Sequence, residues 1–441
     1  MENTADDARR IARNTAFMYL RWLLLAAGNL FAVRLVLSAL GVESYGMVAA
    51  VGAVTAMLVF LNGVLQSTAQ RFLSFALGKN EGGDPSDAFA AIAGITLMLC
   101  AAILLVGETV GLGFVACRLS VAEGIRPAAM AIYQAGIVHV LLDTLLLPVA
   151  ALIGATERMG FFVRVSFAET LLSLSVAGAL FALPSHRPEA YAALVALKSA
   201  VILSLFVLHV RRLCPNMRWS VKFRLSELRE QGGYFFWSML HAAANALKVN
   251  GVALLVNQYA GVVHSASWRI GYEIGSVGGG IYNSFRQAYF PQLVKRWPLD
   301  DRRPFRLLTL GACRWSFALT SLFVVPVMVF TDAILSLWIG YVPSASMVAF
   351  VRCFAVHYLL DSLVEPMHSA VLATGRIARY EVGQFLTLGT GFVFAFIALA
   401  AGLPAWTSVA AVAVGAGLNL AYHVVWLKLR LGIAVWRSDG R

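Results

Sequence analysis

Charged side chains interrupt the long apolar stretches of this sequence. Eight of these side chains are basic, namely Arg21, Arg34, Lys198, Lys248, Arg269, Arg286, Arg314 and Arg352. Six are acidic, namely Glu108, Asp143, Glu169, Glu273, Asp361 and Glu365. A charge at the centre of a membrane costs about 2.5 to 3.5 kcal/mol, so such residues usually face a protein interior or a water-filled cavity. Cations in a cavity could bind phosphate, because arginine presents a rigid fork of donors that matches phosphate oxygens.

Some of these charges have simpler explanations. Four basic residues lie within about two turns of the end of an apolar segment, where a long side chain can reach the membrane surface. They are Arg21, Lys198, Arg314 and Arg352. Arg269 and Glu273 are four residues apart, which on a helix allows them to pair.

Two histidine–aspartate pairs each have the spacing of one helical turn. They are His139 with Asp143 and His357 with Asp361, and Glu365 adds a further acid one turn beyond the second pair. A carboxylate beside an imidazole in a low-dielectric setting can bind and release a proton or a sodium ion near neutral pH, which would suit an ion-coupling site. The alternative is a buried pair that holds helices together.

A polar stripe marks one further apolar segment. His241, Asn245 and Lys248 fall at positions i, i+4 and i+7, on one face of an otherwise apolar helix. We expect this face to contact water or substrate.

The histidine–aspartate pairs belong to an internal repeat. Residues 138–143 read VHVLLD, and 218 positions later residues 356–361 read VHYLLD. Pro148 and the motif ATER at 155–158 return as Pro366 and ATGR at 373–376. The chain is therefore expected to be a duplication of one membrane unit.

The apolar composition predicts that membrane-spanning helices position these residues. The 441 residues are 59% hydrophobic and 13% charged, about half the charge of an average soluble domain. A membrane-crossing helix needs about 20 apolar residues. We predict twelve such helices, at 15–40, 45–70, 88–114, 128–154, 160–183, 190–210, 232–258, 264–290, 306–330, 346–372, 380–401 and 404–428. The prediction is an all-α polytopic membrane protein with a first lobe at 1–214, a cytoplasmic linker at 215–231, and a second lobe with a short tail at 232–441.

The net charge of +12 is distributed unevenly among the loops. With the N-terminus inside, 24 basic residues fall in inner loops and ends, and only Arg118, Arg126 and Arg187 fall in outer loops. This asymmetry follows the positive-inside rule and predicts that both termini are cytoplasmic. The excess charge is thus a topology signal that also attracts anionic lipids, and nucleic acid is not an expected partner.

No cofactor is predicted beyond a coupling ion, H⁺ or Na⁺. The five cysteines are scattered, and the histidine–aspartate pairs lack further ligands with metal-site spacing. The sequence contains no phosphate-loop motif, so we do not expect ATP to drive transport directly. Gly275 and the run at 278–280 follow no strand, so we expect them to permit close helix approach.

Several motifs carry a resemblance to a known family. They are VRLVL and LGVESYG at 33–37 and 40–46, LNG at 61–63, TAQRFLSF at 68–75, TERM at 156–159, LVNQYAG at 255–261, NSFRQA at 283–288, PQLVK at 291–295 and ATGR at 373–376. In this order they resemble the polysaccharide-flippase (Wzx-like) branch of the multidrug/oligosaccharidyl-lipid/polysaccharide (MOP) exporter superfamily.

The resemblance implies two pseudo-symmetric six-helix lobes in a V around a central cavity. It implies alternating access that moves a polyprenyl-diphosphate-linked oligosaccharide from the inner to the outer leaflet of the bacterial cytoplasmic membrane, for assembly of a surface polysaccharide such as the O-antigen of lipopolysaccharide. Expected partners are this cargo, membrane lipids and other glycan-assembly membrane proteins.

The resemblance also places the first, second, seventh and eighth helices along the cavity. The expected substrate-binding residues are therefore Arg21, Arg34, Lys248, Arg286, His241 and Asn245. Lys248 departs from the family, in which an uncharged polar residue is expected there in many relatives.

Two alternatives stay open. A MATE-type antiporter of drugs or organic cations would use the same fold, but its cavity should present net carboxylate. A polytopic glycan polymerase or glycosyltransferase would need catalytic groups on a substantial outer loop, and the outer loops here are short, so we expect no enzymatic activity.

Overall fold

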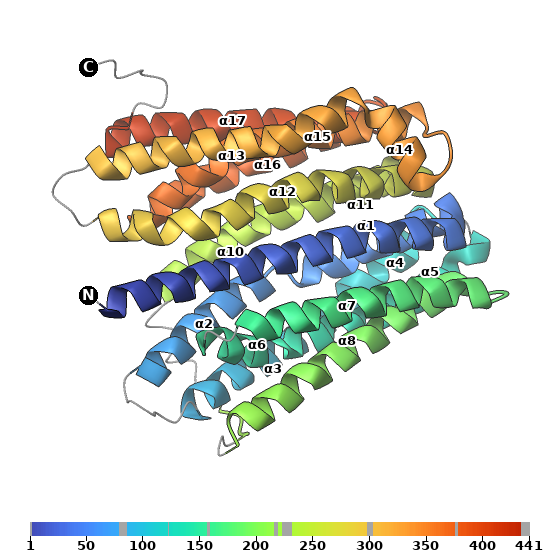
Figure 1. Ribbon diagram of the computed structural model, residues 1–441. Helices are drawn as coiled ribbons and strands as arrows, with labels where there is room; N and C mark the ends of the chain where they lie inside the picture. Colours follow the sequence, from blue (N-terminus) through green and yellow to red (C-terminus); the bar gives the residue numbers. More distant parts are fainter. Residues whose placement is uncertain are drawn as a thin grey trace. The chain divides into compact units, whose positions relative to one another are not determined.

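The computed structural model describes residues 2–78, 86–121, 123–156, 159–215, 219–222, 232–297, 303–374 and 378–433 (Figure 1). Within these ranges all regular secondary structure is helical and no strand occurs. Ten helices among the described residues are long and apolar enough to cross a membrane. Helices suit this composition because a spanning segment must satisfy its backbone hydrogen bonds internally. The predicted all-α, multi-pass membrane fold is thus confirmed.

The chain divides into two compact units. The first comprises Met1–Ala246 and Gly261–Val263, and the second comprises Leu247–Ala260 and His264–Arg441. Helices that lie in the first unit are α1 (Glu2–Leu58), α2 (Asn62–Gly78), α3 (Ser86–Val106), η1 (Gly107–Gly111), α4 (Leu112–Cys117), η2 (Glu123–Ile125), α5 (Arg126–Leu145), α6 (Leu147–Ala155), α7 (Met159–Ala179), η3 (Leu180–Ala182), α8 (Arg187–Leu213) and α10 (Gly232–Ala246).

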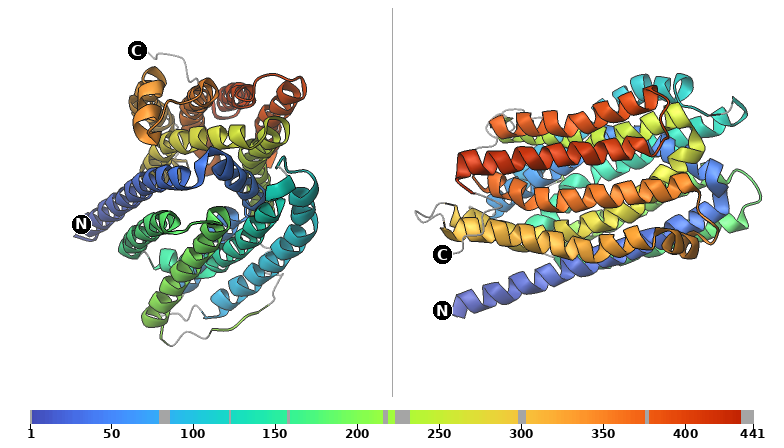
Figure 2. Two further views of the ribbon diagram at one scale, coloured as in Figure 1. Left: turned by 90° about the vertical axis from the view of Figure 1, so that its right-hand side faces the viewer. Right: turned by 90° about the horizontal axis from the view of Figure 1, so that it is seen from above.

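The second unit is built from long α-helices, the short α11 and α14, and a π-helix. They are η4 (Leu247–Gly251), α11 (Val252–Ala260), α12 (Val262–Arg296, which begins at the boundary), α13 (Arg303–Val329), α14 (Thr331–Ile339), α15 (Ala345–Ala373), α16 (Ala378–Ala400) and α17 (Thr407–Leu431). Within this unit α15 packs against both α13 and α17, and α17 packs against α16 (Figure 2). Helix α15 is therefore the central element of the unit.

The predicted boundary between the first two segments is confirmed, whereas the second segment, predicted at 45–70 as one helix, is interrupted at 59–61. Gly41 has φ 76° and breaks the helical backbone of α1 between the segments predicted at 15–40 and 45–70. The helix stops at Leu58, and the chain is helical again from Asn62 through residue 70. The chain turns after Leu58, where the Asn62 N–H donates to the Val59 carbonyl at 2.9 Å and the Asn62 side chain donates to Thr144 at 3.0 Å. The polar Asn62 thus follows the end of one helix and begins α2.

Both copies of the repeat motif lie in helices. Residues 138–143 lie in α5 and residues 356–361 lie in α15. Pro148 stands in the first turn of α6, just after a break, whereas α15 continues through Pro366. The first residues of a helix donate no hydrogen bond within it, so Pro148 is well placed at the start of α6. The first copy is therefore divided between α5 and α6, whereas the second copy is one long helix, α15.

Glycines on α12 allow it to approach α15 closely, as the sequence predicted. A Cβ atom on Gly275 would lie 2.8 Å from ring carbons of Tyr358, and one on Gly279 would lie 2.8 Å from the same ring. Gly271 meets Phe354 at 3.0 Å in the same way. These three glycines are spaced by four residues and form the flat face on which the aromatic side chains of α15 lie.

We predict that Gly275→Ala destabilises the protein by about 1 to 3 kcal/mol, because the added methyl group must displace the Tyr358 ring. Thermal unfolding of the purified protein in detergent measures this loss. Gly311→Ala is the matched control, since a Cβ atom there would meet nothing within 4 Å. Equal unfolding temperatures for the two variants would contradict the close packing.

Candidate functional site

A buried ion pair joins η4 to α15 in the second unit. The Lys248 ammonium donates to Asp361 Oδ2 at 3.2 Å, and the two side chains are 8% and 15% exposed. Lys248 lies in a single π-helical turn between α10 and α11. Such turns are rare and are frequent at functional sites.

His357 completes this arrangement from one turn earlier on α15. Its Nε2 lies 3.3 Å from the same Asp361 oxygen, and the histidine is buried. Its Nδ1 has no hydrogen-bond partner among the described residues. The carboxylate therefore lies between an ammonium and an imidazole that can still accept a proton, which is the chemistry expected of a cation-coupling site.

A second ion pair joins α12 to α15. Arg286 Nε donates to Glu365 Oε1 at 3.1 Å, and the Ser369 hydroxyl donates to the same oxygen at 3.4 Å. The Arg286 guanidinium also lies over the Phe290 ring, 5.3 Å from its centroid. Both cations that the sequence assigned to substrate binding in the second half are thus paired with acids of α15.

The repeat copy in the first unit has a different environment. His139 Nε2 lies 3.7 Å from Asp143, His139 Nδ1 bonds with the Ser199 hydroxyl at 2.7 Å, and the pair is 32% and 47% exposed. The nearby Lys198 ammonium is engaged with Glu169 at 3.8 Å. The pairing of histidine and aspartate is common to both copies, but only the second copy is buried with a lysine bonded to its aspartate.

The other predicted site residues are separate from these pairs. Arg34 is exposed on α1 and forms no ion pair with any described residue. The side chain of Arg21 lies outside the described residues. On α10 the Asn245 amide donates to His241 Nε2 at 2.9 Å. The expected pairing of Arg269 with Glu273 is confirmed.

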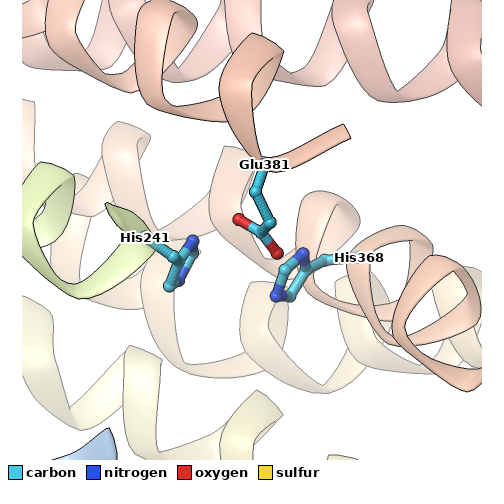
Figure 3. Close-up of side chains that lie close together, drawn as sticks. All are labelled: His241, His368 and Glu381. Atoms are coloured by element: carbon cyan, nitrogen blue, oxygen red, sulfur yellow. The ribbon is translucent and has the colours of Figure 1, made fainter. Parts of the chain in front are cut away.

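Sequence reasoning missed a buried polar cluster on α15, α16 and α17. It consists of His368, Tyr380, Glu381 and His423. His368 Nδ1 bonds with the Tyr380 hydroxyl at 2.8 Å, and that hydroxyl also bonds with His423 Nε2. Figure 3 shows the side chains of Glu381 and His368 directed toward each other. The signal was present, because His368 follows Asp361 by seven residues and so shares its helix face.

We predict that Lys248→Met costs about 3 to 5 kcal/mol of stability, because it leaves the buried Asp361 carboxylate without its ammonium partner. The double variant Lys248→Met/Asp361→Asn should lose less than the sum of the two single losses, as measured by thermal unfolding in detergent. Arg352→Met, which breaks a more exposed pair with Asp332, is the control and should cost at most about 1 kcal/mol. Additive losses in the double variant would contradict a direct interaction.

Comparison with known proteins gives no matching family model and no matching curated protein. Solved structures do match. The MATE multidrug transporter DinF-BH is 11% identical, with 97% of both chains covered and a TM-score of 0.74. An inward-facing multidrug resistance MATE family transporter of the MOP superfamily is 14% identical, with 96% of this chain and 99% of that chain covered and a TM-score of 0.69.

A third match is a MOP superfamily transporter from Pyrococcus furiosus, for which a binding pocket of reverse polarity suggests a different function. It is 15% identical, with 97% of this chain and 96% of that chain covered and a TM-score of 0.67. Identities this low establish the fold and nothing finer. Across nearly its whole length, this chain has the fold of the MATE transporters of the MOP superfamily.

Proposed function

We propose that this protein is a secondary transporter that works by alternating access and couples transport to a cation at the Asp361 site. The fold likeness over almost the full length of known transporters supports the reaction class. The buried grouping of Asp361, Lys248 and His357 supports the coupling role. In this proposal the chain catalyses no covalent reaction and lies in the bacterial cytoplasmic membrane, with both termini inside as the basic loops predict.

The cargo best supported is an organic cation exported by a MATE-type antiporter. The observation that carries this proposal is that three intramembrane cations of the second unit are each paired with an acid. Three cations are matched by three acids, in the pairs Lys248–Asp361, Arg286–Glu365 and Arg269–Glu273. These groups do not form the cationic surface that a diphosphate would need.

Charge balance also suggests how the coupling would operate. A proton bound at Asp361 leaves the Lys248 ammonium uncompensated, and one bound at His357 makes two cations share one carboxylate. Either event adds one positive charge to a low-dielectric region. A cationic cargo bound near the same pairs would add another. Two such charges repel strongly where water is scarce, so the proton and the cargo would bind alternately, as antiport requires.

The second candidate is the flippase of a polyprenyl-diphosphate-linked oligosaccharide. It is favoured by Arg34, which is exposed and has no ion-pair partner among the described residues, and by the sequence motifs that resemble the flippase branch. In this candidate, Arg34 and Arg21 would bind the diphosphate, and protonation of Asp361 and Glu365 would release Lys248 and Arg286 from their ion pairs. Membrane lipids and glycan-assembly proteins would then be partners.

We predict that the purified protein in liposomes moves the cationic dye rhodamine 6G in response to an imposed pH gradient. Asp361→Asn should reduce the stimulation of dye transport by the pH gradient by about five- to 150-fold, because the site can no longer exchange a proton. Asp332→Asn is the matched control, since Asp332 is an exposed acid on α14. Gradient-driven transport that survives Asp361→Asn unchanged would rule out this coupling site.

The flippase candidate makes a different prediction. If it is right, the chain restores surface glycan in a strain that lacks a lipid-linked oligosaccharide flippase, and Arg34→Ala abolishes that rescue while the protein still folds. If the antiporter candidate is right, no flippase-deficient strain is rescued and Arg34→Ala leaves dye transport intact. Surface-glycan staining and dye flux together decide between the two cargoes.

A further inference from the structure

The last turn of α8 and the segment that follows it present basic and aromatic side chains together. Four exposed residues, Arg211, Arg212, Trp219 and Val221, make up what we call the Arg211 patch. Trp219 and Val221 are 43% and 45% exposed, so the patch has an open apolar part as well as a charged part. An exposed indole is favoured at the boundary between lipid headgroups and hydrocarbon, where its ring meets apolar chains and its N–H meets polar groups.

Contacts with α3 and α8 hold the segment that carries Trp219. The Lys222 backbone N–H donates to an α3 carbonyl at 2.9 Å, and the Lys222 ammonium donates to Asp87 Oδ1 at 2.5 Å. The Trp219 ring packs edge to face with Phe89, with centroids 5.4 Å apart, and the Arg211 guanidinium lies over the same indole at 5.6 Å. The indole and the guanidinium are therefore fixed beside each other by the first unit.

The arginines at the two ends of α8 use their hydrogen-bond donors differently. Arg187, at the start of the helix, donates to the carbonyls of Leu183 and Ala39 at 2.8 and 2.9 Å. Arg211 and Arg212 form no hydrogen bond or ion pair with any described residue through their guanidinium groups. Cations in a last turn also complement the helix dipole, but that effect does not occupy their N–H groups. These donors remain available for an external acceptor.

The charge of the patch indicates what that acceptor is. Asp87, the acid that this segment contacts, is already paired with Lys222, so it does not neutralise the two arginines. Arginine forks match the oxygens of a phosphate group, and the exposed indole matches apolar chains. An anionic phospholipid carries both of these features in one molecule.

We propose that the Arg211 patch binds an anionic diacyl phospholipid, such as phosphatidylglycerol, in the cytoplasmic leaflet. The two guanidinium groups bind the headgroup phosphate, while Trp219 and Val221 contact the glycerol and the upper acyl chains. The positive-inside rule assigns this end of α8 to the cytoplasmic side. The proposal rests on the membrane fold and is independent of the cargo.

The second unit has a related arrangement at the end of its own last helix. Arg430 lies in the last turn of α17, 218 positions after Arg212, which is the offset of the internal repeat. Its guanidinium lies over the Trp426 ring at 5.7 Å, and that ring packs against Tyr380 and Tyr422. Arg430 is exposed and has no ion pair with a described residue. An arginine over a tryptophan at the end of both helices is expected where both meet anionic headgroups.

Tryptophan fluorescence of the full-length protein in phosphatidylcholine vesicles tests the site. Equal small mole fractions of brominated phosphatidylglycerol or brominated phosphatidylcholine are included, because bromine quenches only indoles that lie close to it. Subtraction of the signal of Trp219→Phe isolates the contribution of Trp219. We expect brominated phosphatidylglycerol to quench Trp219 more strongly, and we expect Arg211→Gln and Arg212→Gln each to lower that preference about fivefold.

Arg352→Gln is the matched control, because Arg352 is also exposed but donates to Asp332 at 3.0 Å, and it should leave the preference unchanged. Equal quenching of Trp219 by the two lipids, or quenching by neither, would overturn the proposal. A preference that survives Arg211→Gln/Arg212→Gln would overturn it as well, and if this double variant fails to fold, the two single variants decide.

Free phosphate is the other source of the same chemistry. If inorganic phosphate at constant ionic strength abolishes the preference, the patch binds a soluble anion and the lipid proposal is wrong. Dye flux does not enter these measurements, so failure of the transport proposal would leave their outcome unchanged.

Discussion

The Lys248–Asp361 ion pair is the interaction on which the second unit depends. The two side chains are only 8% and 15% exposed, and removing either one leaves the other charge without its partner. The attraction between them fixes the π-helical turn that carries Lys248 against the face of α15 that carries Asp361. Because that face also presents Glu365 to Arg286, α15 serves as the acidic partner of two different elements.

Much of the fold could be predicted from the sequence, because hydrocarbon leaves a spanning segment little choice other than a helix. The break at Gly41 was predictable from the gap between two apolar stretches. The turn after Leu58 was not, because Asn62 is one polar residue in an apolar run and its partner Thr144 is 82 residues away in sequence. Local composition cannot show where a side chain will find such a partner.

In the candidate site, too, the sequence did not show which distant side chains become partners. Sequence reasoning found Asp361, His357, Lys248 and Arg286, but it assigned the acids to ion coupling and the cations to an anionic substrate. Lys248 and Asp361 are 113 residues apart, and neither helical periodicity nor spacing connects them. Glu381 was missed because it stands at the very start of a predicted segment, where an acid normally lies in water. The structure buries it beside His368.

The internal repeat shows how neighbours decide the chemistry of a motif. Both copies place histidine and aspartate one turn apart, but Leu30 stands 218 positions before Lys248, so at this offset the first copy has no lysine to match. The Asp143 side chain remains 47% exposed, so solvent reaches its carboxylate. The less exposed Asp361 carboxylate is stabilised instead by Lys248 and His357, so a change in its protonation alters the attraction between η4 and α15. Protonation can shift helices only where protein side chains, and not solvent, stabilise the charge that changes. Of the two copies, the second has that environment, because Lys248 and His357 contact Asp361.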